Sequence, residues 1–168
     1  FTLLGASTKK GDVNTIGEYG SGSKYSIASL MRNNLMFHVF AGEQEIKFTS
    51  KPKEFRGQSY NVICVNGVET SLTTTMGGED WDNSFAYIRE IYSNALDEDS
   101  DTELIVTDNP VGEKGHTCFF IQFTSDVKNF YDNIEDFFCI NNPEVLHVNN
   151  KGSIYPHKKN ELRLFRKG

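Results

Sequence analysis

The sequence lacks any apolar run that approaches the about 18 residues needed for a membrane-spanning helix. Cysteine is scarce: Cys64, Cys118 and Cys139 lie far apart and form no Cys-x-x-Cys pair, which argues against a disulfide framework and a zinc knuckle. The 4 histidines are scattered without the spacing of metal ligands. These absences favour reduced, buried thiols in a cytoplasmic chain with no membrane partner.

Basic residues are in the minority as well. The chain has 17 Lys and Arg against 23 Asp and Glu, a net charge of −6, so there is no strong nucleic-acid signal, although a local anion pocket is compatible with this balance. With 38 % hydrophobic residues, the 168 residues predict one globular domain with a core. Because the chain runs from Phe1 to Gly168 without an initial Met, we expect it to be a piece of a longer protein.

Apolar periodicity predicts both helices and strands. Helices are expected over 24–33, from about Asp80 to Leu96, and from a cap at Ser125 onward. Strands are expected over 35–41, 44–49, 60–65, 68–75, 103–107 and 117–123, with short strands in the tail and a polar loop over 50–58. Asn66-Gly67 is a strong hairpin signal. The pattern predicts an α/β two-layer sandwich with a mixed, mostly antiparallel sheet and helices on one face.

Three polar residues share one face of the second expected helix. Glu90, Asn94 and Asp97 stand at positions i, i+4 and i+7, so their side chains line up along the helix. Such a face is often merely solvated. Its chemistry is nevertheless coherent, because an Asn oxygen suits a hard Mg²⁺ ion that phosphates also hold. A Glu one turn away can orient or deprotonate a water aimed at a γ-phosphate.

A turn after the strand expected over 103–107 is a second candidate. Asp108 ends that strand and is followed by a tight turn that closes at Gly112. A carboxylate in this place can accept a hydrogen bond from the exocyclic amine of a base. An ordinary Asx turn uses the same residue types, so the stretch alone does not decide between the two interpretations.

A glycine-rich stretch precedes the first expected helix. From Ile16 to Lys24 it has the sequence Ile-Gly-Glu-Tyr-Gly-Ser-Gly-Ser-Lys. Glycines at the start of a helix expose backbone N–H groups that bind anions. The stretch does not fit a P-loop, which needs Gly-x-x-x-x-Gly-Lys-Ser/Thr, because Ser23 separates Gly22 from Lys24 and the preceding segment is a loop.

Taken together, these stretches resemble the motifs of the GHKL ATPases, the family of gyrase, heat-shock chaperone, histidine kinase and MutL ATP-binding domains. Glu90-x-x-x-Asn94-Ala95-x-Asp97 is similar to the N-box helix, and Asp108-x-x-x-Gly112 to the adenine-binding glycine box. Gly17-x-x-Gly20-x-Gly22 resembles the lid glycine box. Gly5–Lys9 is similar to the Ser/Thr-Lys stretch of the lid, and Thr73–Thr75 resembles the strand with the adenine-side threonine.

The motifs stand in a rotated order. In the family the N-box comes first, whereas here the lid and its glycines lie over 1–24 and the N-box and adenine box over 80–124. Such a circular permutation is tolerated when the break falls in a mobile surface loop. Permuted forms of this kind resemble phage-encoded GHKL-like ATPases, which would act in the host cytoplasm. Pro110 departs from the family's glycine and fixes φ at the adenine turn.

The resemblance implies one ATP-binding domain over 1–168 with a permuted Bergerat-like fold, in which 125–168 add a helix and strands. It implies Mg²⁺-dependent ATP binding and slow hydrolysis with lid closure. Glu90 would be the general base, Asn94 the metal ligand and Asp108 the adenine contact. The other residues implied in nucleotide binding are Asp97, Val111, Gly112, Lys9, Gly17, Gly20, Ser21, Gly22, Ser23, Lys24, Thr74 and Thr75.

Two alternatives from other functional classes stay open. One is a nucleotide-sensing switch that binds ATP without turnover and acts on a protein partner or on further domains of the same chain. The other is an interaction module with a degenerate pocket. Phosphate release separates the ATPase from both alternatives, and calorimetric ATP binding separates the switch from the module.

Overall fold

The computed structural model describes residues 21–98, 102–138 and 145–156 of the 168-residue chain. Within these ranges the fold is of the α/β kind, with three α-helices and three small antiparallel sheets. The helices are α1 (Gly22–Arg32), α2 (Ser84–Glu98) and α3 (Ser125–Asp132), with short 3₁₀ turns η1 (Gly78–Trp81) and η2 (Ile134–Asp136). The strands are β1 (Phe37–Ala41), β2 (Gln44–Ile46), β3 (Phe48–Phe55), β4 (Gln58–Val65), β5 (Val68–Thr73), β6 (Thr117–Ile121), β7 (His147–Asn149) and β8 (Gly152–Ile154).

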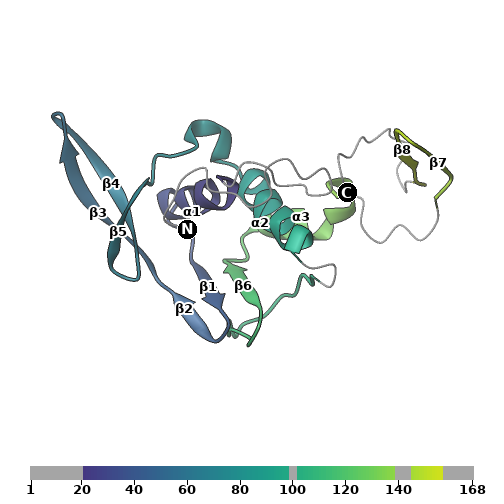
Figure 1. Ribbon diagram of the computed structural model, residues 1–168, viewed down its shortest axis with the longest axis horizontal. Helices are drawn as coiled ribbons and strands as arrows, with labels where there is room; N and C mark the ends of the chain where they lie inside the picture. Colours follow the sequence, from purple (N-terminus) through teal and green to yellow (C-terminus); the bar gives the residue numbers. More distant parts are fainter. Residues whose placement is uncertain (1–20, 99–101, 139–144, 157–168) are drawn as a thin grey trace.

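The strands form separate sheets, which corrects the expectation of one mixed sheet. Their orders are β2-β1-β6, β3-β4-β5 and β7-β8, and every pair is antiparallel. In the first sheet Val39 of β1 stands opposite Phe119 of β6. The chain turns away after β2 and begins a new hairpin at Phe48, so the ladder does not continue from β2 to β3. Figure 1 shows the second sheet extending away from the helices.

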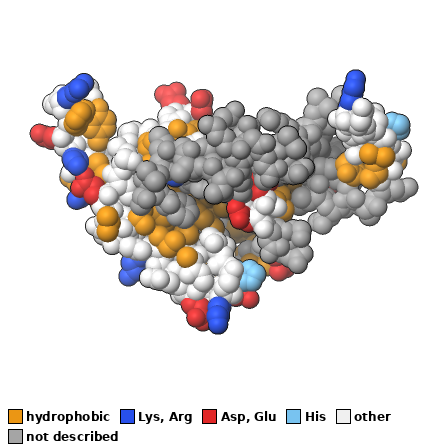
Figure 2. All heavy atoms as spheres, in the orientation of Figure 1, with side chains coloured by type: hydrophobic (Ala, Val, Ile, Leu, Met, Phe, Trp, Pro, Cys, Tyr) orange, Lys and Arg blue, Asp and Glu red, His pale blue; other side chains and the backbone are white. Residues whose placement is uncertain are grey.

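The projecting hairpin of β3 and β4 occupies the stretch 50–58, where the sequence predicts a polar loop. Arg56 and Gly57 have positive φ values of 52° and 77° and close a tight turn there. β3 is an edge strand with mostly exposed side chains, which gives it a loop-like composition. Lys51 and Lys53 pair with Glu69, and their hydrogen bonds lower the pKa of Glu69 to about 2. Figure 2 shows charged side chains of both signs beside exposed hydrophobic ones at this end.

Two further strand predictions have opposite outcomes. The hairpin predicted at Asn66-Gly67 is confirmed, because these residues have φ values of 50° and 79° and link β4 to β5. The strand predicted over 103–107 is absent, and this stretch of the described chain joins no ladder. Thr102, which comes just before this stretch, bonds to α2 instead, since its Oγ1 donates to the Ala95 carbonyl at 2.9 Å.

The three predicted helices are present with shifted ends. α1 begins at Gly22 rather than Lys24, and α2 begins at Ser84 after η1. The N-cap of α3 is Thr124 rather than Ser125, and its side chain accepts a hydrogen bond from the Val127 amide. None of the helices within 21–98, 102–138 and 145–156 has both the length and the apolar character of a membrane span.

α1 lies between two parts of the core. On one side Ile27 and Ala28 pack with Ile63 of β4 and Leu72 of β5. On the other side Leu30 joins a cluster of α2 residues and aromatic residues in and after α3, namely Tyr87, Ile88, Tyr92, Phe130 and Phe138. The middle of α1 is therefore held between the second sheet and α2.

Candidate functional site

The amino end of α1 lies directly against the middle of α2. A Cβ built on Gly22 would come within 1.8 Å of Glu90 Oε1 and 2.2 Å of Glu90 Cγ, so the absence of a side chain at Gly22 makes room for Glu90. One turn further along α2, Asn94 Nδ2 donates to Ser23 Oγ at 3.0 Å. One cluster is thus formed by Gly22, Ser23, Glu90 and Asn94, although 71 positions separate Ser23 from Asn94.

Backbone groups of the first turn of α1 border the same cluster. The amides of Lys24 and Tyr25 donate to the Ser21 carbonyl at 3.1 and 3.0 Å. Ser26 Oγ donates to the Gly22 carbonyl at 3.0 Å. The first amides of a helix have no acceptor within the helix. The Gly22 and Ser23 amides are therefore the donors that this cluster can present to an anion.

Lys24 adds a buried amine to this turn. Its residue is 6 % exposed, and burial lowers its pKa because the charged form loses solvation. Glu90 brings a carboxylate to the same end of α1, with a side chain that is 21 % exposed. The positive end of a helix dipole favours such negative charge. The cluster thus combines backbone donors, an amide side chain and a carboxylate, with Lys24 in the same turn of α1.

Four of the predicted site residues therefore come together: Gly22 and Ser23 from the lid motif, and Glu90 and Asn94 from the N-box motif. Lys24 follows them in the first turn of α1. Ser21 is the N-cap of α1 and makes no side-chain capping bond. Asp97 lies near the end of α2, partly buried. The predicted residues Lys9, Gly17 and Gly20, with the lid stretch before Gly20, lie outside the described residues.

The predicted adenine turn has a different setting from the one expected. Asp108 is exposed and follows an irregular segment, so it does not end a strand. Thr107 Oγ1 accepts a hydrogen bond from the Asn109 amide at 3.1 Å, which makes a local turn. Val111 is 57 % exposed. The prediction based on strand position is wrong, because residues 103–107 pair with no strand in the part of the chain that the structure describes.

Gly112 packs against the β1–β2 hairpin rather than against either helix of the cluster. A Cβ at this position would lie 2.2 Å from the Gly42 carbonyl oxygen and 2.8 Å from Phe40 Cβ. Replacing Gly112 by Ala is expected to lower the free energy of unfolding by about 1–3 kcal/mol, because backbone atoms cannot rotate away from the added methyl group. Urea unfolding of Gly112→Ala measures this loss.

Gly152→Ala is the matched control, since a Cβ there meets nothing within 4 Å. Its stability should stay close to that of the parent. If Gly112→Ala were as stable as Gly152→Ala, the close packing of residue 112 on the first sheet would be wrong.

The predicted threonines lie at the opposite end of α1 from Gly22. Thr74 is buried just after β5, where its amide donates to the Asn61 carbonyl at 3.0 Å and its carbonyl accepts from Arg32. Thr75 is exposed, and its Oγ1 lies 3.0 Å from that of Thr73. The 11 residues of α1 separate the two ends by about 15 Å.

A scan against protein-family models and searches of curated proteins and of solved structures find no significant match. Sequence reasoning missed Arg32, which makes the most extensive polar contacts of α1. The sequence marks Arg32 only as a basic residue in the last turn of a helix. A positive charge in that position interacts favourably with the helix dipole in any protein.

Proposed function

We propose that this chain is a permuted GHKL-type ATPase with a Bergerat-like site, which binds ATP with Mg²⁺ and hydrolyses it slowly. The observation that carries the proposal is the contact of Gly22 and Ser23 with Glu90 and Asn94. The contact joins residues 71 positions apart and places two polar side chains of α2 against the first turn of α1. An anion-binding helix end beside a carboxylate and an amide oxygen suits the hydrolysis of the phosphoanhydride bond of a nucleoside triphosphate.

The residues of this cluster fit a magnesium nucleotide. The Gly22 and Ser23 amides and the Lys24 side chain supply donors and charge for phosphate oxygens. Asn94 uses Nδ2 for Ser23, so its Oδ1 is the atom suited to Mg²⁺. Among the described residues no three His, Cys, Asp or Glu side chains are grouped to hold a metal, so phosphate oxygens would complete the coordination. When bound, Mg²⁺ neutralises charge on the phosphates.

Glu90 is the proposed general base. Its carboxylate lies at the amino end of α1, where the γ-phosphate would bind, and it can accept the proton of an attacking water. The water oxygen forms a bond to the γ-phosphorus as the bond to the β–γ bridging oxygen breaks, which gives ADP and inorganic phosphate. The proposed lid, which would precede α1, would exclude bulk water when it closes over the nucleotide.

Asp108→Ala tests the adenine side of the proposal. A hydrogen bond from the adenine amine to a carboxylate contributes about 1.5–3 kcal/mol, so its loss should weaken ATP binding at least about tenfold. Isothermal titration calorimetry with Mg-ATP measures the change, and titration with Mg-pyrophosphate is the control because it contains no adenine. Unchanged ATP affinity in Asp108→Ala would remove Asp108 from the site and leave the phosphate side untouched.

Calorimetry of the parent protein with Mg-ATP, followed by a phosphate-release assay, tests the proposed function itself. Binding with release supports the ATPase, and binding without release favours the nucleotide-sensing switch. No binding favours the interaction module and contradicts the proposal.

We further propose that the protein acts in the cytoplasm, which is that of the host if the chain is phage-encoded. It would act there on a protein partner or on further domains of the same chain.

A further inference from the structure

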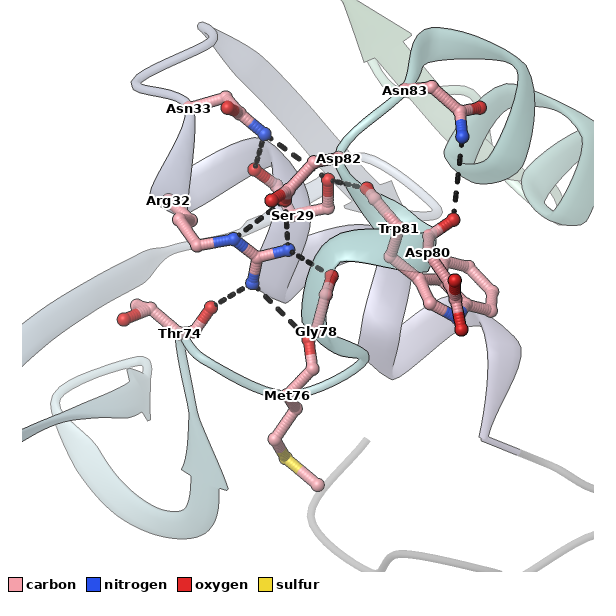
Figure 3. Close-up of polar contacts among 10 residues, drawn as sticks. All are labelled: Ser29, Arg32, Asn33, Thr74, Met76, Gly78, Asp80, Trp81, Asp82 and Asn83. Carbon is pink, nitrogen blue, oxygen red and sulfur yellow. Dashed lines mark hydrogen bonds and ion pairs between the residues drawn. The ribbon is translucent and has the colours of Figure 1, made fainter.

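Arg32, in the last turn of α1, bonds through its guanidinium group to the connection between β5 and α2 (Figure 3). Nη1 donates to the carbonyl of Thr74 and, at 3.2 Å, to that of Met76. Nη2 donates to the Gly78 carbonyl at 3.2 Å and to Asp82. Nε also donates to Asp82 Oδ1, at 2.8 Å. All three guanidinium nitrogens are used, which a lysine ammonium cannot reproduce because it lacks the planar fork.

The segment that Arg32 holds is the connection that leads into α2. Gly77 and Gly78 have φ values of 86° and 60°, which glycine adopts readily, and a Cβ on Gly77 would lie 2.8 Å from the Trp81 ring. Ser29 Oγ donates to the Trp81 carbonyl, as Figure 3 shows. The connection that leads into α2 is therefore bonded to the carboxyl-terminal half of α1 by side chains on consecutive turns.

The two helices are thus joined along their length. Arg32 and Ser29 fix one end, Ser26 Oγ lies 3.3 Å from the Tyr87 carbonyl in the middle, and Asn94 reaches Ser23 at the other end. An α-helix is a stiff rod, so a shift of the Arg32 end along α2 moves Gly22 by a similar amount. Reacting groups tolerate little displacement, since an error of about 1 Å can lower a rate about 10²-fold.

We propose that Arg32 is a positioning residue that sets the distance between the amino end of α1 and the Glu90–Asn94 face of α2. It acts from about 15 Å away through the rod of α1 and touches no reacting atom. The catalytic part of this inference rests on the proposed ATPase function. The positional part does not rest on that function, because the distance between the two helices can be measured without nucleotide.

The experiment compares the parent protein with Arg32→Lys, which keeps the charge and loses the fork, and with Val39→Ala. Val39 is fully buried in the first sheet, so Val39→Ala controls for lost stability without touching the guanidinium contacts. Each protein is also made with Ser23→Cys and Asn94→Cys, and a short bifunctional thiol reagent links the two positions. Mass spectrometry measures the rate of the 23–94 link, and a phosphate-release assay on the proteins without added cysteines gives kcat and KM.

In Arg32→Lys we expect the 23–94 link to form several-fold more slowly and kcat to fall about tenfold with little change in KM. Val39→Ala should lower the thermal midpoint and leave the link rate unchanged. An unchanged link rate in Arg32→Lys, or an equal slowing in Val39→Ala, would overturn the positioning role. A slowed link with an unchanged kcat would also overturn its catalytic part. A slowed link in a protein whose parent has no turnover would uphold the positional role and contradict the ATPase instead.

Discussion

Replacing Glu90 by Gln is expected to lower ATP turnover by about 10²–10⁴-fold, because the attacking water loses its proton acceptor. The amide is isosteric with the carboxylate and fits the same space beside Gly22. Nucleotide affinity should therefore stay within a few-fold of the parent value. Single-turnover phosphate release measures the chemical step, and calorimetry with Mg-ATP measures binding.

Glu98→Gln is the matched control, since Glu98 lies on the same helix and is exposed. It should retain parental turnover. A fully active Glu90→Gln protein would exclude Glu90 as the general base while leaving nucleotide binding open. If Glu90→Gln lost both turnover and affinity, the carboxylate would be holding the amino end of α1 in place rather than accepting a proton.

Gly22→Ala is expected to reduce turnover about 10²-fold with little loss of stability. The new Cβ would occupy the place of the Glu90 carboxylate, which lies 1.8 Å away at Oε1, so the carboxylate must swing aside. A displaced general base loses its alignment with the water. The loss of stability should stay below about 2 kcal/mol, because the Glu90 side chain, Cγ included, is partly exposed and can move to another rotamer, and because alanine favours the helix over glycine.

This combination of lost turnover and retained stability separates a functional contact from a packing contact. Phosphate release and urea unfolding are measured on the same preparations, with Gly152→Ala as the glycine control. A protein with Gly22→Ala that turns over at the parental rate would show that Glu90 need not lie against α1. A large loss of stability would show that the contact serves to pack the helices.

Local chemistry in the sequence was sufficient to predict part of the fold. Asn66-Gly67 predicts its hairpin because only a few residue types adopt two successive positive φ values. The spacing of Glu90 and Asn94 predicts their shared face because an α-helix repeats every 3.6 residues. Neither the hairpin signal nor the helical spacing predicts the contact between Gly22 and Glu90. Only the family resemblance indicated that these two residues meet.

The features that sequence reasoning missed depend on distant backbone groups. Ser26 and Ser29 are fully buried in α1, because carbonyls of α2 and η1 accept hydrogen bonds from their hydroxyl groups. Arg32 bonds to carbonyls 42 to 46 positions away. A carbonyl is present in every residue, so no pattern of side chains marks these acceptors. The edge strand β3 was missed for a related reason, since its exposed lysines resemble those of a loop.

The long separation between Ser23 and Asn94 has a consequence for how the protein folds. Closing a loop of 71 positions costs chain entropy before any contact offsets it, and such non-local contacts slow folding. During synthesis α1 leaves the ribosome well before α2, with five strands made in between. The first turn of α1 thus has to wait for α2 before the bond between Ser23 and Asn94 can form.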